Sequence, residues 1–121
     1  MVLESANEES PTTICRTNYP EMYYSVPQLI ARHAVGGCKM NVGDLIGSGT
    51  VSGPAPDSCG SLLELSWGGA RPVRLQNGET RSFLETGDRV TLHGQASTRD
   101  YRIGFGECNG LILPSPPEPV W

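Results

Sequence analysis

The sequence has 121 residues, enough for one domain with a single hydrophobic core. Its 9 Lys and Arg against 13 Asp and Glu give a formal net charge of -4, which argues against nucleic acid as a partner because no basic surface would neutralise phosphates. No apolar stretch approaches the roughly 20 residues that span a bilayer, and residues 1–10 lack the basic and apolar regions of a signal peptide. We therefore expect a cytoplasmic protein with no membrane contact.

The cysteines indicate a reducing environment. Four are present, widely and unevenly spaced and without a Cys-x-x-Cys pair: Cys15, Cys38, Cys59 and Cys108. A disulfide framework in so short a chain normally has denser cysteines, so reduced thiols are the simplest interpretation. A zinc finger is not supported either, because His33 and His93 lie far apart and neither has a cysteine at finger spacing.

The N-terminal residues have an unusual pattern. Residues 1–5 resemble the end of a strand, and an acidic linker follows over residues 7–10. Because a natural domain rarely begins so abruptly, this start suggests a fragment of a longer protein. We assign residues 1–121 to one partial domain, with residues 1–12 as a truncated strand end and linker and residues 114–121 as a proline-rich tail.

Residues 22–35 predict the one helix of the chain. Apolar residues recur there at intervals of three and four: Met22, Tyr23, Val26, Leu29, Ile30 and Ala34. The pair Gly36-Gly37 provides a stop. Pro27 removes one backbone donor, so the helix either begins near it or bends there.

Strand and turn signals dominate from Gly43 onward. The 15 glycines and 10 prolines leave only short apolar runs between them, which indicates mainly β structure. We expect strands over these ranges: 43–51, 62–67, 73–83 (a hairpin that turns at Asn77-Gly78), 89–94, 101–105 and 110–113. The tail cannot join the interior of a sheet and is expected to lie over the surface. The predicted fold class is α+β, mainly β, with one helix packed against mostly antiparallel strands.

Several catalytic motifs are approached but not met. Gly47–Gly53 and Gly104–Gly110 both have the pattern G-x-G-x-x-x-G, one residue too long for a dinucleotide-binding loop, and we interpret them as turn glycines. Neither Ser48 nor Ser52, the serines of Gly47–Gly53, lies at the serine position of the G-x-S-x-G motif that marks a catalytic nucleophile. His33 and His93 have no local support for a catalytic relay, so we interpret both as surface or packing residues.

Glu64 places a charge inside an apolar run. In the predicted strand 62–67, two-residue alternation puts Leu63, Leu65 and Trp67 on one face and Glu64 on the other. The simpler interpretation places Glu64 in solvent on a half-buried strand. The alternative is a carboxylate that faces a cleft, where it would orient an imidazole and stabilise it once it takes a proton. The pattern leaves both open, and no histidine of this chain is an obvious partner.

Thr50 is similarly ambiguous. A glycine beside a hydroxyl, as in Gly49-Thr50, marks either a turn or a point where a substrate carboxylate approaches the backbone. In the second case the carboxylate would accept hydrogen bonds from the N–H and O–H groups. Residue spacing does not choose between the two.

The chain resembles the C-terminal part of the fumarylacetoacetase family in a series of blocks in the same order. The blocks are HAVGGC (33–38), GDLIGSGTVSGP (43–54), GSLLELSW (60–67), NGETRSFL (77–84), GD (87–88) and YRIGFG (101–106). The resemblance as a whole extends from about residue 13 to residue 114, nearly the whole chain. Hydratases and isomerases of the wider superfamily usually have Gly-Thr-Pro where this chain has Gly49-Thr50-Val51, and they form the alternative assignment.

The resemblance implies the mixed β-sandwich or roll of that family's C-terminal domain. It also implies a hydrolase that cleaves a carbon–carbon bond of the small molecule fumarylacetoacetate, in tyrosine and phenylalanine breakdown, to give fumarate and acetoacetate. By the same resemblance, Glu64 orients the histidine that activates water, and Thr50 contacts the substrate carboxylate.

The family's histidine, the acidic ligands of its Ca²⁺ or Mg²⁺ ion and its other substrate-binding residues lie upstream of the matched blocks. We therefore expect this chain to be inactive alone and, when intact, to form a homodimer. Two hypotheses of function remain. The first is a piece of a hydrolase of this family, and the second is a non-catalytic remnant that serves as an assembly or interaction module.

Overall fold

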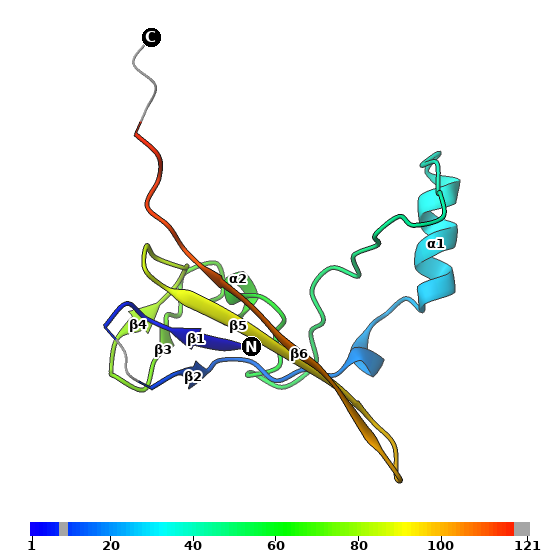
Figure 1. The fold of residues 1–121 in the computed structure, drawn as a ribbon. Helices are drawn as coiled ribbons and strands as arrows, with labels where there is room; N and C mark the ends of the chain where they lie inside the picture. Colours follow the sequence, from blue (N-terminus) through cyan, green and yellow to red (C-terminus); the bar gives the residue numbers. More distant parts are fainter. Residues whose placement is uncertain (8–9, 118–121) are drawn as a thin grey trace.

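The computed structural model describes residues 1–7 and 10–117, and its ribbon is shown in Figure 1. Its elements, in chain order, are β1 (Val2–Glu4), β2 (Thr12–Thr13), a 3₁₀ turn (Tyr19–Glu21), α1 (Val26–Val35), α2 (Leu62–Leu65), β3 (Val73–Arg74), β4 (Thr80–Arg81), β5 (Arg89–Ser97) and β6 (Arg102–Leu111). Most of the regular structure is strand, and α1 is the one helix longer than a single turn in these two ranges. The predicted fold class, mainly β with one helix, is confirmed.

The strands form two antiparallel sheets. The larger has the order β2-β1-β5-β6, and the smaller is the hairpin β3-β4. That hairpin turns through Asn77-Gly78 as predicted, with Gly78 at a φ of 89°, a left-handed conformation that glycine adopts without strain. β5 and β6 form a long ribbon that projects beyond the rest of the sheet (Figure 1).

A small hydrophobic core connects the larger sheet to the other elements. Leu3 of β1 is fully buried, and Ile14 and Leu75 are nearly so. Partly buried apolar side chains pack against these three: Met1, Leu62, Leu65, Val73 and Val90. Because Leu62 and Leu65 belong to α2, burial of their apolar surface holds that helix against the sheet.

A buried ion pair fastens the hairpin to the start of β5. The side chain of Asp88 is fully buried and that of Arg81 is 9% exposed, and the guanidinium Nε donates to Asp88 Oδ2 over 3.0 Å. Asp88 Oδ2 also accepts from the Glu85 backbone N–H over 2.8 Å. A second carboxylate, Glu79, accepts from Arg81 over 3.0 Å at the rim. These contacts satisfy the charges that burial removes from water.

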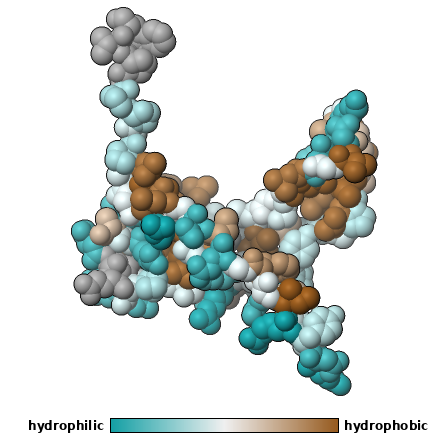
Figure 2. All heavy atoms as spheres, viewed as in Figure 1, coloured by the Kyte–Doolittle hydropathy of each residue, from teal (hydrophilic) through white to brown (hydrophobic). Residues whose placement is uncertain are grey.

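The helix α1 begins at Val26, so Pro27 lies in its first turn. Of the two alternatives for this proline, a helix start or a bend, the structure shows the start. The Ser25 backbone N–H donates to Gln28 Oε1 over 2.8 Å, which helps to close the N-terminus. The expectation that the helix packs against the strands is wrong. None of its residues is buried, and it stands apart from both sheets (Figure 1). Figure 2 shows apolar side chains gathered over it.

Three other predicted elements differ from the structure. Residues 43–51 form no strand, and residues 62–67 contain the helix α2 in place of a strand. The glycines of Gly104–Gly110 are not turn residues, because they lie within β6, which continues unbroken to Leu111. The two strands expected over 101–105 and 110–113 are therefore one. The pairing with β5 shifts register in the middle of this strand, because Phe105 and Gly106 of β6 lie opposite Gly94 of β5, between the pairs His93–Glu107 and Gln95–Gly104.

Residues 114–117 are exposed and extend away from the sheets (Figure 1), in contrast to the prediction that they lie over the surface. The remainder of the tail, 118–121, and residues 8–9 of the linker lie outside the described residues. No helix in the described ranges is long and apolar enough to cross a membrane. All four cysteines are free, as expected.

Candidate functional site

Glu64 lies on α2, a single helical turn whose sequence contains its own start signal. Ser61 is the N-cap, and its Oγ accepts from the Glu64 backbone N–H over 3.3 Å. The pattern Ser61-x-x-Glu64 is typical of a capping box, in which a serine and an acidic residue three positions later close a helix N-terminus. This signal favours a helix over the strand that two-residue alternation suggested. The alternation was misleading, because Ser66 is fully buried while Trp67 is 69% exposed.

Two serine hydroxyls hold the Glu64 carboxylate. Ser52 Oγ donates to Glu64 Oε2 over 2.7 Å, and Ser61 Oγ donates to the same oxygen over 3.2 Å. Ser52 Oγ in turn accepts from the Gly60 backbone N–H over 2.9 Å. Neither serine was a predicted site residue. Ser61 could have been found from its capping pattern, whereas Ser52 is 12 positions from Glu64 and no local signal connects them.

The approach of the two segments depends on a glycine. A Cβ placed on Gly60 would lie 2.5 Å from the carbonyl oxygen of Val51 and 2.7 Å from its nitrogen. These are backbone atoms, which cannot move aside as a flexible side chain can. Any other residue at this position would push the segment that contains Ser52 away from the start of α2.

Thr50 lies two residues before Ser52 in the chain. It is exposed, and Gly49 before it has a φ of 74°, so the chain turns there through a left-handed residue. Thr50 therefore lies on the same strand-free segment as Ser52, which reaches Glu64. Ser52 and Gly60 bring the segments of the two predicted site residues together, and within the described residues no hydrogen bond joins Thr50 directly to Glu64.

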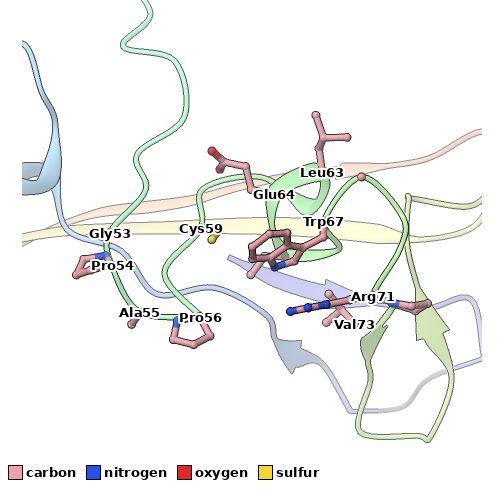
Figure 3. Close-up of a pocket in the computed structure, with 13 residues that line it drawn as sticks. Gly53, Pro54, Ala55, Pro56, Cys59, Leu63, Glu64, Trp67, Arg71 and Val73 are labelled. Carbon is pink, nitrogen blue, oxygen red and sulfur yellow. The ribbon is translucent and has the colours of Figure 1, made fainter.

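A pocket of about 850 Å³ opens beside Glu64. It is lined by Gly53, Pro54, Ala55, Pro56, Cys59, Leu63, Glu64, Leu65, Trp67, Gly68, Arg71, Pro72 and Val73, many of which Figure 3 shows. Trp67 has a φ of 52°, a left-handed conformation that costs a non-glycine residue about 1–2 kcal/mol. The Arg71 guanidinium lies 4.8 Å from the centre of the indole ring, at cation–π distance. Most of the residues that line the pocket are apolar, and Glu64 and Arg71 are the two charged ones.

The remaining candidate residues lie elsewhere. His33 is on the exposed helix α1, and the Nδ1 atom of His93 lies 3.7 Å from Glu107 on the β5-β6 ribbon, so neither lines the pocket. Both are surface residues, one of the two predicted interpretations. Burial raises the pKa of the Cys15 thiol, which therefore favours its neutral form. Within residues 1–7 and 10–117, no three His, Cys, Asp or Glu side chains gather to hold a metal ion.

Comparison with known proteins places the chain in a family. The family model for the C-terminal domain of fumarylacetoacetate hydrolase matches residues 7–112. The chain is 46% identical to the fumarylacetoacetase of Arabidopsis thaliana and 47% identical to that of Bos taurus, each over 95% of its length. It is 46% identical to the Homo sapiens fumarylacetoacetase over 93% of its length. The chain spans 27% of the length of these relatives. Because the family model covers most of the sequence, the chain belongs to the fumarylacetoacetate hydrolase C-terminal family.

Proposed function

We propose that this chain is the C-terminal part of a fumarylacetoacetase, which adds water across a carbon–carbon bond of fumarylacetoacetate to release fumarate and acetoacetate. The names of the relatives and the match over residues 7–112 support the proposal. In this reaction a base takes a proton from water and the water oxygen attacks a carbonyl carbon. The bond from that carbon to the acetoacetate part then breaks, and the enolate that leaves takes up a proton at carbon to give acetoacetate. The protein acts in the cytoplasm, as a homodimer, on a small-molecule substrate.

The observation that carries this proposal is the way Glu64 is held. Both serine hydroxyls donate to Oε2, so they fix the carboxylate while Oε1 accepts no hydrogen bond from the described residues. A carboxylate with one such oxygen can accept from an imidazole N–H, keep the other ring nitrogen unprotonated, and stabilise the imidazolium that forms. Glu64 is the positioning residue for the water-activating histidine, and Thr50 donates to a substrate carboxylate.

The histidine and the metal belong to another part of the protein. The two histidines of this chain do not line the pocket beside Glu64, and the described residues do not fit a Ca²⁺ or Mg²⁺ site because no three of their His, Cys, Asp or Glu side chains are placed to hold an ion. No step of the reaction is therefore assigned to a metal held by this chain. The matched part contributes the oriented carboxylate and the Thr50 hydroxyl, and a preceding segment contributes the base and the ion.

The test begins with the transcript that encodes this chain. We expect an in-frame extension upstream of Met1 that encodes a histidine and an acidic cluster. The protein expressed from that whole open reading frame, here called the full-frame protein, should hydrolyse fumarylacetoacetate. The 121-residue chain alone should not, even with added Ca²⁺. A stop codon directly upstream of Met1, or a full-frame protein without hydrolysis, would overturn the proposal.

A substitution in the full-frame protein tests the role of Glu64. Glu64→Gln keeps the size and shape of the side chain but removes the negative charge that stabilises the imidazolium. Turnover should fall on the order of 10²-fold while the protein stays folded. Unchanged turnover would return Glu64 to the role of a solvent-facing surface residue.

A second candidate function is that of an assembly module without catalysis. It is favoured by α1, which exposes apolar side chains such as Val26 (53%), Ile30 (42%) and Val35 (90%). Such a module would pair with a complete fumarylacetoacetase subunit. Size-exclusion chromatography of the 121-residue chain mixed with the Bos taurus enzyme tests this function. A mixed complex supports it, and two separate peaks reject it.

A further inference from the structure

We propose that Ser52 is a positioning residue for Glu64, and that it couples the segment of Thr50 to the carboxylate that orients the catalytic base. This inference rests on the proposed function, since it assigns a role within the same site. Ser52 was not singled out by any sequence motif as a functional residue. Its role follows from what its hydroxyl contacts in the folded chain.

The Ser52 hydroxyl is held at both of its hydrogen-bonding ends. It accepts from the Gly60 backbone N–H over 2.9 Å and donates to Glu64 Oε2 over 2.7 Å. A hydroxyl that already accepts from a fixed backbone donor has its own proton directed toward the remaining acceptor. The proton of Ser52 is thus aimed at the carboxylate, and a hydrogen bond to a charged acceptor is among the stronger kinds.

The position of Ser52 is set by the backbone. Gly60 allows the chain at Val51 to approach so closely that a Cβ would lie 2.5 Å from the Val51 oxygen. The peptide unit beside Ser52 therefore rests directly on the residue that leads into α2. Ser61, the other donor to Glu64, is the N-cap of the same helix and contacts Oε2 over a longer distance of 3.2 Å.

Two donors on one oxygen fix the direction of the other. A carboxylate on the flexible glutamate side chain can rotate about its terminal bond, but two hydrogen bonds to Oε2 from different segments restrain that rotation. Oε1 then has one preferred direction. Without Ser52 the carboxylate would keep only the longer bond from Ser61, and the imidazole would be presented with a less well-defined acceptor.

Removal of the Ser52 hydroxyl should slow the chemical step without weakening substrate binding. In the full-frame protein, Ser52→Ala should lower kcat about tenfold, as expected for the loss of one hydrogen bond to a charged group, with KM changed less than about twofold. Ser52→Thr retains a hydroxyl on Cβ and should restore kcat to within about threefold of the unaltered protein.

A matched substitution controls for simple loss of a buried hydroxyl. Ser58 lies in the same loop, is 7% exposed, and donates from Oγ to the Ala55 carbonyl oxygen over 2.7 Å without contact to Glu64. Ser58→Ala should lower the unfolding temperature at least as much as Ser52→Ala while leaving kcat within about twofold. This contrast separates positioning of the carboxylate from general stability.

The outcomes distinguish the inference from the function on which it depends. If Glu64→Gln leaves turnover unchanged, the proposed function of Glu64 fails and this inference fails with it. If Glu64→Gln reduces turnover but Ser52→Ala does not, only the role of Ser52 is overturned. The same holds if Ser58→Ala reduces kcat as much as Ser52→Ala, or if Ser52→Thr restores nothing. A fall in kcat specific to Ser52→Ala and reversed by threonine supports the inference.

Discussion

The buried pair Arg81–Asp88 should contribute more to stability than any other single ion pair of the described chain. The side chain of Asp88 is fully buried and that of Arg81 is only 9% exposed. Asp88→Asn therefore leaves the Arg81 guanidinium buried without its negative partner. Removal of one partner of a buried pair costs about 3–5 kcal/mol. Asparagine keeps one oxygen as an acceptor, and the carboxylate of Glu79 remains at 3.0 Å from the guanidinium, so we expect about 3 kcal/mol, at the low end of that range.

Urea unfolding of the 121-residue chain, followed by circular dichroism, measures this loss. Glu85→Ala is the matched control, because Glu85 Oε2 also lies near Arg81, at 3.7 Å, but its side chain is 65% exposed. An exposed pair of this kind contributes under about 1 kcal/mol. The double variant Arg81→Leu with Asp88→Leu removes both charges and should lose less than Asp88→Asn alone. If Asp88→Asn costs no more than Glu85→Ala, the assignment of the pair as a buried stabilising contact is refuted.

Three further predictions concern separate features of the chain. Gly60→Ala forces a Cβ against the opposite backbone and should lower the free energy of unfolding by about 2 kcal/mol in the same urea assay, whereas Gly47→Ala, with open space around it, should be nearly neutral. Cys15 is buried and its pKa is raised, chiefly by that burial, so at pH 8 iodoacetamide should alkylate it more slowly than the two exposed cysteines, a difference that mass spectrometry detects and unfolding abolishes. The pKa of Glu79 is lowered, first by the hydrogen bond from the Asn7 side chain, so its contribution to stability is present above the ordinary glutamate pKa and is lost as pH falls through the lowered one. Asn7→Ala should raise the pKa of Glu79 in an NMR titration, and an unchanged value would contradict this cause.

Local signals predicted the elements that depend on neighbouring residues. The helix α1 follows from the spacing of its apolar residues, and Pro27 limited the choice to a start near that residue or a bend, of which the structure shows the start, at Val26. The hairpin β3-β4 follows from Asn77-Gly78, because that pair adopts the backbone angles of a tight turn. Both features are set within a few residues of the chain, so the sequence alone was sufficient for them.

The interpretation of α2 was wrong because six residues are too few for a period to be decisive. In residues 62–67, apolar side chains at alternate positions fit a strand, and the same residues fit one turn of a helix. The capping pattern of Ser61 and Glu64 was the better guide, because a serine at this spacing can accept a hydrogen bond from a backbone N–H of the first helical turn, as Ser61 Oγ does from the Glu64 N–H. The packing expected for α1 also differed, because amphipathic spacing indicates an apolar face but not what covers it.

The sequence by itself determined the family, the charged residue placed within an apolar run, and the turn glycine that closes the β3-β4 hairpin. The tertiary structure decided which groups meet. Ser52 contacts Glu64 across 12 positions, and Arg81 contacts Asp88 from a different element, each without a pattern that marks the pair. Hydrogen bonds and ion pairs depend on distances of about 3 Å between atoms, and residue order does not specify such distances between segments joined by irregular loops. Glu64 could therefore be selected from the sequence, whereas the contact of its carboxylate with Ser52 could be found only from the fold.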